Sequence, residues 1–127
     1  MGLRRNLWLE RLGPDYIASA LTRAHRELAA LNLDIYVTEL DVNDRELPAA
    51  IGERDRAVAA VYGAFLAAIL PEPRLKLITS WGLSDRTTWL NGFFPRADGL
   101  PQRPLPCNEN NQPKPATASI QTALNKR

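Results

Sequence analysis

The chain has few of the side chains from which metal and redox sites are built. Its 127 residues include one histidine and one cysteine. The single cysteine, Cys107, excludes an internal disulfide, and with only one histidine beside it a His/Cys metal cluster is excluded as well. Nothing in the sequence supports a cofactor, and we expect none.

Long apolar runs and clustered charge are also missing. There is no stretch of about 18 apolar residues, so we expect no membrane span and no membrane partner. The formal net charge is only +2, and the basic residues are scattered among acids. A nucleic-acid partner is not expected, because it would need a clustered basic face. The hydrophobic fraction of 45% fits an ordinary globular domain.

Residues 34–42 carry the most informative pattern that is present. Residues 35–38 are β-branched or aromatic and favour a short, covered strand, which we expect over residues 33–37. Glu39 and Asp41 stand where that strand should end. In a regular strand, carboxylates at i and i+2 point to the same face. Enzymes with parallel strands carry their chemistry at such C-terminal strand ends, although a strand followed by a polar turn gives the same pattern.

A second strand is predicted over residues 75–79. It ends beside Trp81, and Trp89 follows eight positions later. Between the strands, residues 58–70 have apolar side chains at helical spacing and stop before two prolines. This order predicts a strand–helix–strand unit with parallel strands. The composition of residues 91–113, rich in glycine, proline and asparagine, predicts a long loop that is either functional or disordered. A closing helix is expected over residues 115–124.

Three segments together resemble one enzyme family. Thr38-Glu39-Leu40-Asp41 is similar to the nucleophile motif of glycoside hydrolase family 10, the endo-1,4-β-xylanases. Trp81-Gly82-Leu83-Ser84-Asp85-Arg86 with Trp89 resembles that family's eighth-strand motif, and Pro104-Leu105-Pro106 with Gln112-Pro113-Lys114-Pro115-Ala116 resembles its closing segment. The motifs occur in the family's order with similar spacing, and the resemblance covers residues 28–124.

The resemblance implies an α/β fold that is a partial TIM (β/α)8 barrel, since a whole barrel needs about 250 residues. Residues 1–127 then form a single truncated catalytic-domain fragment. Residues 1–27 resemble the segment after the fourth strand, and residues 28–124 resemble strands seven and eight with the closing helix. We therefore expect the last βαβ unit plus flanking helices, with an internal deletion that fuses two helices into one over residues 15–31.

The same resemblance assigns roles to single residues. It makes Glu39 the nucleophile of a retaining mechanism and places Trp81, Trp89, Asp41 and Arg86 at the substrate. From the residues alone other readings stay open. Both tryptophans also suit a core, Asp41 also suits the orientation of neighbouring groups, and Arg86 also suits a solvated loop. Asp85 is expected to pair with Arg86 or to cap a loop.

The implied activity is that of a retaining endo-1,4-β-xylanase acting on xylan or xylo-oligosaccharide. No carboxylate of the chain matches the family's acid/base position, so we expect weak activity or none. The alternative is a non-catalytic sugar-binding or inert remnant that self-associates through open strand edges. Family members are typically secreted or periplasmic, whereas residues 1–6 lack an apolar signal region, so localisation stays open.

Overall fold

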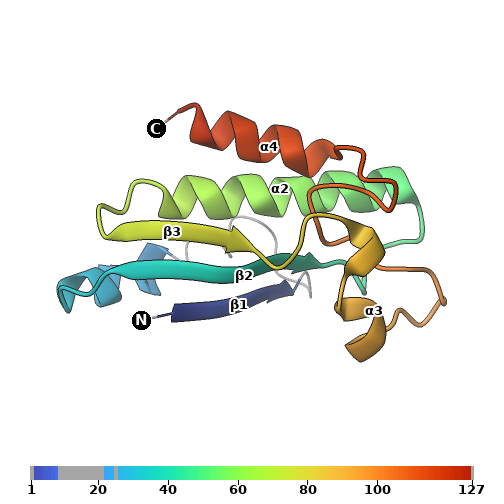
Figure 1. The fold of residues 1–127 in the computed structure, drawn as a ribbon, viewed down its shortest axis with the longest axis horizontal. Coiled ribbons are helices and arrows are strands. Elements are labelled where there is room, and N and C mark those ends of the chain that lie inside the picture. The colour runs from blue at the N-terminus through green and yellow to red at the C-terminus, as the bar shows by residue number, and fades with distance from the viewer. Residues whose placement is uncertain (1, 9–21, 25, 127) are drawn as a thin grey trace.

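The fold is a three-stranded parallel sheet with two helices layered beside it (Figure 1). A computed structural model describes residues 2–8, 22–24 and 26–126. The strand order is β1-β2-β3, and both neighbouring pairs are parallel. The elements are β1 (Gly2–Trp8), β2 (Ile35–Asn43), α2 (Ile51–Ile69), β3 (Leu75–Ser80), the 3-10 turn η1 (Asp85–Thr87), α3 (Leu90–Phe93) and α4 (Pro115–Leu124).

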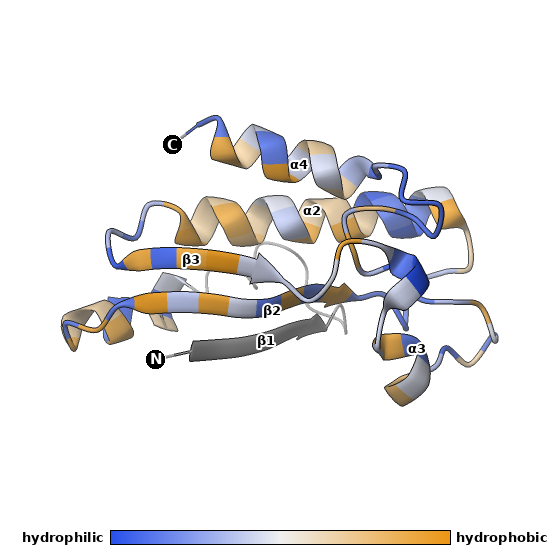
Figure 2. Ribbon diagram, in the orientation of Figure 1, coloured by the Kyte–Doolittle hydropathy of each residue, from blue (hydrophilic) through white to orange (hydrophobic). Residues whose placement is uncertain are grey.

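The core forms where α2 packs on β2 (Figure 2). The buried side of α2 includes Val58, Tyr62 and Phe65, and it meets Ile35 and Val37 of β2, all of them at most 2% exposed. Each such side chain contributes about 1.5–3 kcal/mol through burial. The outer helix α4 packs on α2 and adds further side chains to the same core.

Proline residues mark the C-terminal end of α2 and the N-terminal end of α4. Leu70 closes α2 with a hydrogen bond from its N–H to the Leu66 carbonyl, and Pro71 follows. Pro115 opens α4 in the first helical position, where its missing N–H costs no hydrogen bond. None of the helices described here is long and apolar enough to cross a membrane.

Several expected boundaries need correction. The first predicted strand, residues 33–37, is β2, which starts at Ile35 and continues through both carboxylates to Asn43. The helix expected at 58–70 begins at Ile51, because its polar first turns are anchored by ion pairs that periodicity does not show. The strand expected at 75–79 and the closing helix at 115–124 are confirmed.

The N-terminal segment gives the sheet a strand that the sequence did not predict. β1 pairs with β2 from Gly2 to Trp8, so the sheet has three strands and not two. Of the helix expected over residues 15–31, residues 22–24 and 26–30 are helical. Residues 15–21 and 25 lie outside the described residues, whereas the expected join after residue 27 falls within the described helical residues 26–30.

Three buried ion pairs tie the loop segments to the core. Asp44, just after β2, binds Arg54 of α2 with an N–O distance of 2.6 Å. Arg103 holds Asp55 through two hydrogen bonds of 2.8 and 3.0 Å. The third pair, between Lys114 and Asp85, is 2.7 Å long. The segment expected to be a loop over residues 91–113 is therefore an ordered connection, with residues 102–106 all buried.

Candidate active site

A bulge interrupts β2 at the position of the first carboxylate. Between the pairs Arg4–Thr38 and Asn6–Asp41, β2 has one residue more than β1, and it gains one over β3 between Val37 and Leu40 as well. Glu39 lies inside this bulge with φ of 63°, a left-handed conformation that is uncommon for any residue except glycine. Bulges of this kind occur next to active sites, where they redirect a side chain.

The bulge also changes which residues face the core. Val37 and Leu40 are both buried in the helix-side core although they are three positions apart. Regular alternation, on which the expectation that Glu39 and Asp41 share a face depended, therefore does not apply here. Glu39 is partly exposed, whereas Asp41 has no exposed surface.

Glu39 and Trp81 lie at the same end of neighbouring strands, as the sequence predicts for an inherited site. Ser80, the last residue of β3, pairs with Leu40, and the Trp81 N–H donates to the Leu40 carbonyl at 2.9 Å. The Trp81 side chain is 48% exposed. Gly82 follows with φ of 127°, and a Cβ added there would come within 3.0 Å of Leu105. Only glycine fits this turn, in which the chain leaves the strand direction directly after Trp81.

The second tryptophan is fixed by the second carboxylate. The Trp89 Nε1–H donates to Asp41 Oδ2 at 2.7 Å. The Trp89 ring also packs at a tilt against Phe93 and edge-on against Phe94, with centroid distances of 5.5 and 5.6 Å. Trp89 is thus partly buried and held on two sides, whereas Trp81 is open.

The environment of Asp41 disfavours its charged form. The pKa of the Asp41 carboxyl is raised to about 6, chiefly by burial and also by the negative charge of Glu39, while the Trp89 hydrogen bond works in the opposite direction. Asp41 Oδ1 has no hydrogen-bond partner among the described residues. The influence of Glu39 on this pKa shows that the two carboxylates are electrostatic neighbours.

Arg86 and Asp85 do not pair with each other. Asp85 is buried, binds Lys114 and accepts a hydrogen bond from the Leu105 N–H at 2.9 Å, so of the two expectations the loop-capping one is correct. Arg86 is exposed and lines a hollow of about 290 Å³ together with Asn91 and Glu109. Sequence reasoning missed Lys114 as a partner, because a lysine 29 positions away gives no local signal.

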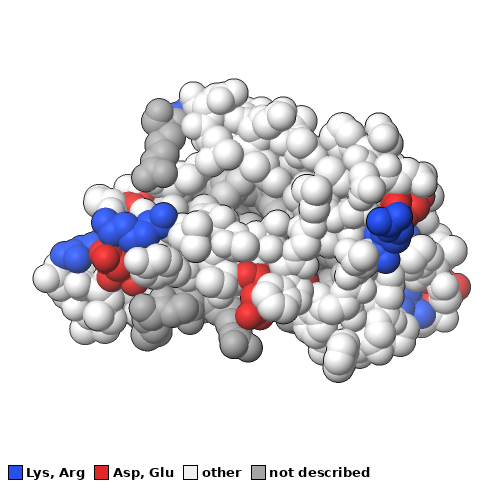
Figure 3. Space-filling model, in the orientation of Figure 1, with Lys and Arg blue, Asp and Glu red and all other residues white. Residues whose placement is uncertain are grey.

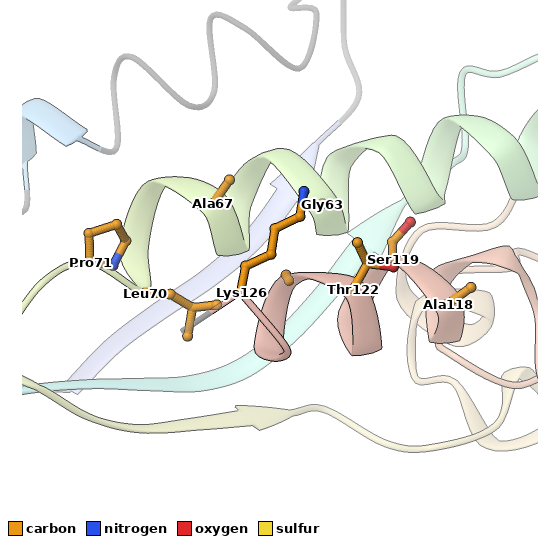
Figure 4. Close-up of a pocket in the computed structure, with 9 residues that line it drawn as sticks. Gly63, Ala67, Leu70, Pro71, Ala118, Ser119, Thr122 and Lys126 are labelled. Atoms are coloured by element: carbon orange, nitrogen blue, oxygen red, sulfur yellow. The ribbon is translucent and has the colours of Figure 1, made fainter.

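Another hollow of the described residues, larger than the one beside Arg86, lies away from the candidate site. A groove of about 710 Å³ runs between α2 and α4 and is lined by small side chains such as Gly63, Ala67 and Ala118 (Figure 4). The view in Figure 3 shows a face with little charge except for acidic atoms near its centre and mixed charges toward its two ends. Over the described residues, His, Cys, Asp and Glu side chains form no group of three that could hold a metal ion.

These features define a class of protein before any comparison. Parallel strands, a helical connection between β2 and β3, and polar and aromatic residues gathered at the strands' C-terminal ends are the plan of parallel α/β enzymes.

Sequence comparison gives the family. A sequence model of glycosyl hydrolase family 10 matches residues 20–123, and this chain belongs to that family. Endo-1,4-beta-xylanase A of Fusarium oxysporum f. sp. lycopersici is 32% identical over 100 residues, which are 79% of this chain and 29% of that protein. For endo-1,4-beta-xylanase B of Thermotoga neapolitana the identity is 31%, over 78% of this chain and 27% of that protein.

Solved structures agree with the family assignment. Native xylanase 10B from Thermotoga maritima superposes with a TM-score of 0.82 at 30% identity and covers 98% of this chain and 36% of that one. Xylanase 10B from Thermotoga petrophila RKU-1, solved in complex with xylobiose, gives a TM-score of 0.82 at 29% identity. The chain spans less than a third of the two curated relatives, and the resemblance read from its motifs is confirmed.

Proposed function

We propose that this chain carries the nucleophile half of a family 10 xylanase site on a partial (β/α)8 barrel, and that it binds xylo-oligosaccharide without hydrolysing it. The observation that carries the proposal is the convergence of a strained, partly exposed Glu39 and an open Trp81 at one end of two paired parallel strands. A relative of similar fold was solved with xylobiose, which supports a sugar of this class as the ligand.

Each residue has a part that its surroundings support. Glu39 takes the nucleophile position that its motif implies. Trp81 offers a flat, exposed face on which the C–H groups of a sugar ring can pack. Arg86 is a rim contact at most, since it lines a separate hollow. Asp41 is completely buried, so we place it behind Trp89 and not against the sugar.

The lack of hydrolysis follows from the second carboxyl group that a retaining glycosidase needs. In such enzymes the acid/base lies about 5–5.5 Å from the nucleophile and protonates the leaving oxygen. Asp41 is the acid nearest to Glu39 along the chain, and its burial prevents it from reaching a glycosidic oxygen. Losing general acid catalysis alone costs a factor of about 10² to 10⁴ in rate.

Self-association through the strand edges is part of the same proposal. β1 and β3 each pair only with β2 among the residues that the structure describes, so each has an edge that a second chain can extend. Leu77 of β3 is 49% exposed beside this edge.

Hydrolysis assays with two substrates test the proposal. We expect the purified chain to have a folded circular dichroism spectrum and no measurable turnover of xylan or of an aryl xylobioside. An aryl glycoside has a good leaving group and needs little acid assistance, so it reports on Glu39 and the local sugar contacts alone.

The control variants are Glu39→Gln and, for comparison, Glu53→Gln on the exposed first turn of α2. Turnover of both substrates that Glu39→Gln abolishes and Glu53→Gln leaves intact would overturn the non-hydrolytic part of the proposal. It would mean that a second carboxyl group completes the site, for instance across a dimer.

A further inference from the structure

The contact between Asp41 and Trp89 joins two parts of the chain that are 48 positions apart. Asp41 belongs to β2, two residues after the bulge, and Trp89 immediately precedes α3. A hydrogen bond of 2.7 Å to a carboxylate is short for an N–H donor and is typical of a charge-assisted interaction. The position of the indole ring is therefore fixed by the position of the carboxylate.

The remaining groups around Asp41 do not satisfy its charge. Asp41 Oδ1 and the Asn43 amide Nδ2 are both buried and have no hydrogen-bond partner among the described residues. From α2, the buried Tyr62 donates its hydroxyl to the Pro104 carbonyl at 3.0 Å and not to Asp41. Burial raises the pKa of Tyr62, with the charges of Asp41 and Asp85 adding to this, so Tyr62 stays neutral when Asp41 titrates.

Glu39, two positions earlier on β2, is the neighbouring carboxylate whose charge acts on Asp41. Glu39 raises the pKa of Asp41, and burial raises it more, to about 6. The Trp89 hydrogen bond stabilises the ionised form and works against both effects. The strength of the Trp89 hydrogen bond therefore depends on whether Asp41 is charged, and the pKa of Asp41 depends on whether Glu39 is charged.

We propose that Asp41 is a positioning residue that holds the Trp89 indole at the C-terminal end of β2 and makes the position of Trp89 depend on the charge of Glu39. That Trp89 contacts a sugar from this position rests on the proposed function. The coupling between the three side chains does not, because it exists in the chain without ligand.

Indole N–H signals in a protein labelled with ¹⁵N-tryptophan test the coupling directly. The chain has three tryptophans, and Trp89→Phe identifies the Trp89 signal. We expect the Trp89 Nε1–H shift to titrate with a midpoint near pH 6, the pKa of its acceptor, while the exposed Trp81 does not follow this titration. A Trp89 signal that is constant between pH 4 and 8 would overturn the proposal, and no variant is needed for this result.

Three variants separate a positioning role from a merely structural one. Asp41→Asn keeps an acceptor oxygen, so the Trp89 signal should stay close to its wild-type position and lose its titration. Glu39→Gln should lower the midpoint, since it removes the charge that raises it. Asp34→Asn, an exposed carboxylate just before β2, is the matched control and should change nothing. An unchanged midpoint in Glu39→Gln would contradict the coupling.

Binding then shows whether the positioning serves the sugar site. Asp41→Ala should weaken xylotriose binding about tenfold, the equivalent of one charge-assisted hydrogen bond, and Asp41→Asn should restore most of it. A wild-type chain that titrates at Trp89 and binds no xylotriose would overturn the proposed function and leave the coupling standing. Equal binding by Asp41→Ala and the wild-type chain would overturn the positioning role.

Discussion

Glu39 adopts a backbone conformation that is common only for glycine, although it carries a carboxylate side chain. Its φ of 63° places it in the left-handed region, which costs a residue other than glycine about 1–3 kcal/mol and persists only where the surroundings impose it. Here β1 and β3 impose it from both sides through the shifted registers. Strained residues of this kind cluster at functional sites, and this agrees with the proposed role of Glu39.

This strain predicts that Glu39→Gly stabilises the fold. Glycine adopts positive φ without steric cost, so we expect the free energy of unfolding to rise by about 1 kcal/mol in urea denaturation. Thr38→Gly, one position earlier in β2 and not among the positive-φ residues, is the matched control and should lose about 0.5–1 kcal/mol. Equal destabilisation of both variants would show that Glu39 is not strained.

At the scale of the elements, buried ion pairs join α2 to the connecting segments around Asp44 and Arg103, in addition to the apolar core that α2 shares with β2 and α4. Arg103 is the clearest case, because it binds Asp55 of α2 with two hydrogen bonds and reaches Glu109 at 3.1 Å. Burial alone would raise the pKa of Asp55, but the hydrogen bonds and charges of Arg103 and Lys114 lower it. Asp55 therefore stays ionised at neutral pH, and removing Arg103 would leave this buried charge with only the longer Lys114 contact of 3.6 Å.

We therefore expect Arg103→Ala to destabilise the chain by about 3–5 kcal/mol, the usual cost of removing one partner of a buried pair. Arg86→Ala removes an exposed arginine and should change the free energy of unfolding by less than about 0.5 kcal/mol. Chemical denaturation of both variants at pH 7 measures the two free energies of unfolding. A loss below 1 kcal/mol in Arg103→Ala would mean that solvent reaches and screens Asp55.

Local signals predicted the elements whose ends are marked by proline or by regular apolar spacing. The helix at Pro115–Leu124 and the strand at Leu75–Ser80 are of this kind. The bulge in β2 was not predictable, because it is defined by pairing with two other strands. The first turns of α2 were missed because Arg54 and Asp55 look like surface residues until their distant partners are known. β1 was missed because its residues were read through the family resemblance as a connecting segment.

The placement of Glu39 and Trp81 at one strand end was predictable from the sequence, whereas the surroundings of Asp41 and Trp89 were not. Placing Glu39 and Trp81 at one end of neighbouring strands required only parallel pairing, and the structure has it. The hydrogen bond between Trp89 and Asp41 joins residues 48 positions apart, so no local sequence pattern could predict it. The roles of the site residues in binding and chemistry stay predictions.

At the scale of the whole molecule, the chain holds a parallel sheet that α2 covers on one face, and a candidate site in which Glu39 is partly exposed and Trp81 is exposed. It matches 36% of the length of the xylanase 10B structure, with nearly all of its own residues included. The helix-side core and the buried ion pairs lie within this part, which is why we expect it to fold by itself. The claim that joins fold and function is that the open end of β2 and β3 still recognises a sugar.

A titration with xylotriose, followed by backbone and indole NMR signals, tests this claim most directly. The account predicts fast-exchange shifts at millimolar sugar that are confined to Glu39, Trp81 and their neighbours. They should disappear in Trp81→Ala and remain in Leu83→Ala, which truncates a still more exposed apolar side chain two positions away. No shifts in a folded wild-type chain, or shifts that persist unchanged in Trp81→Ala, would contradict it.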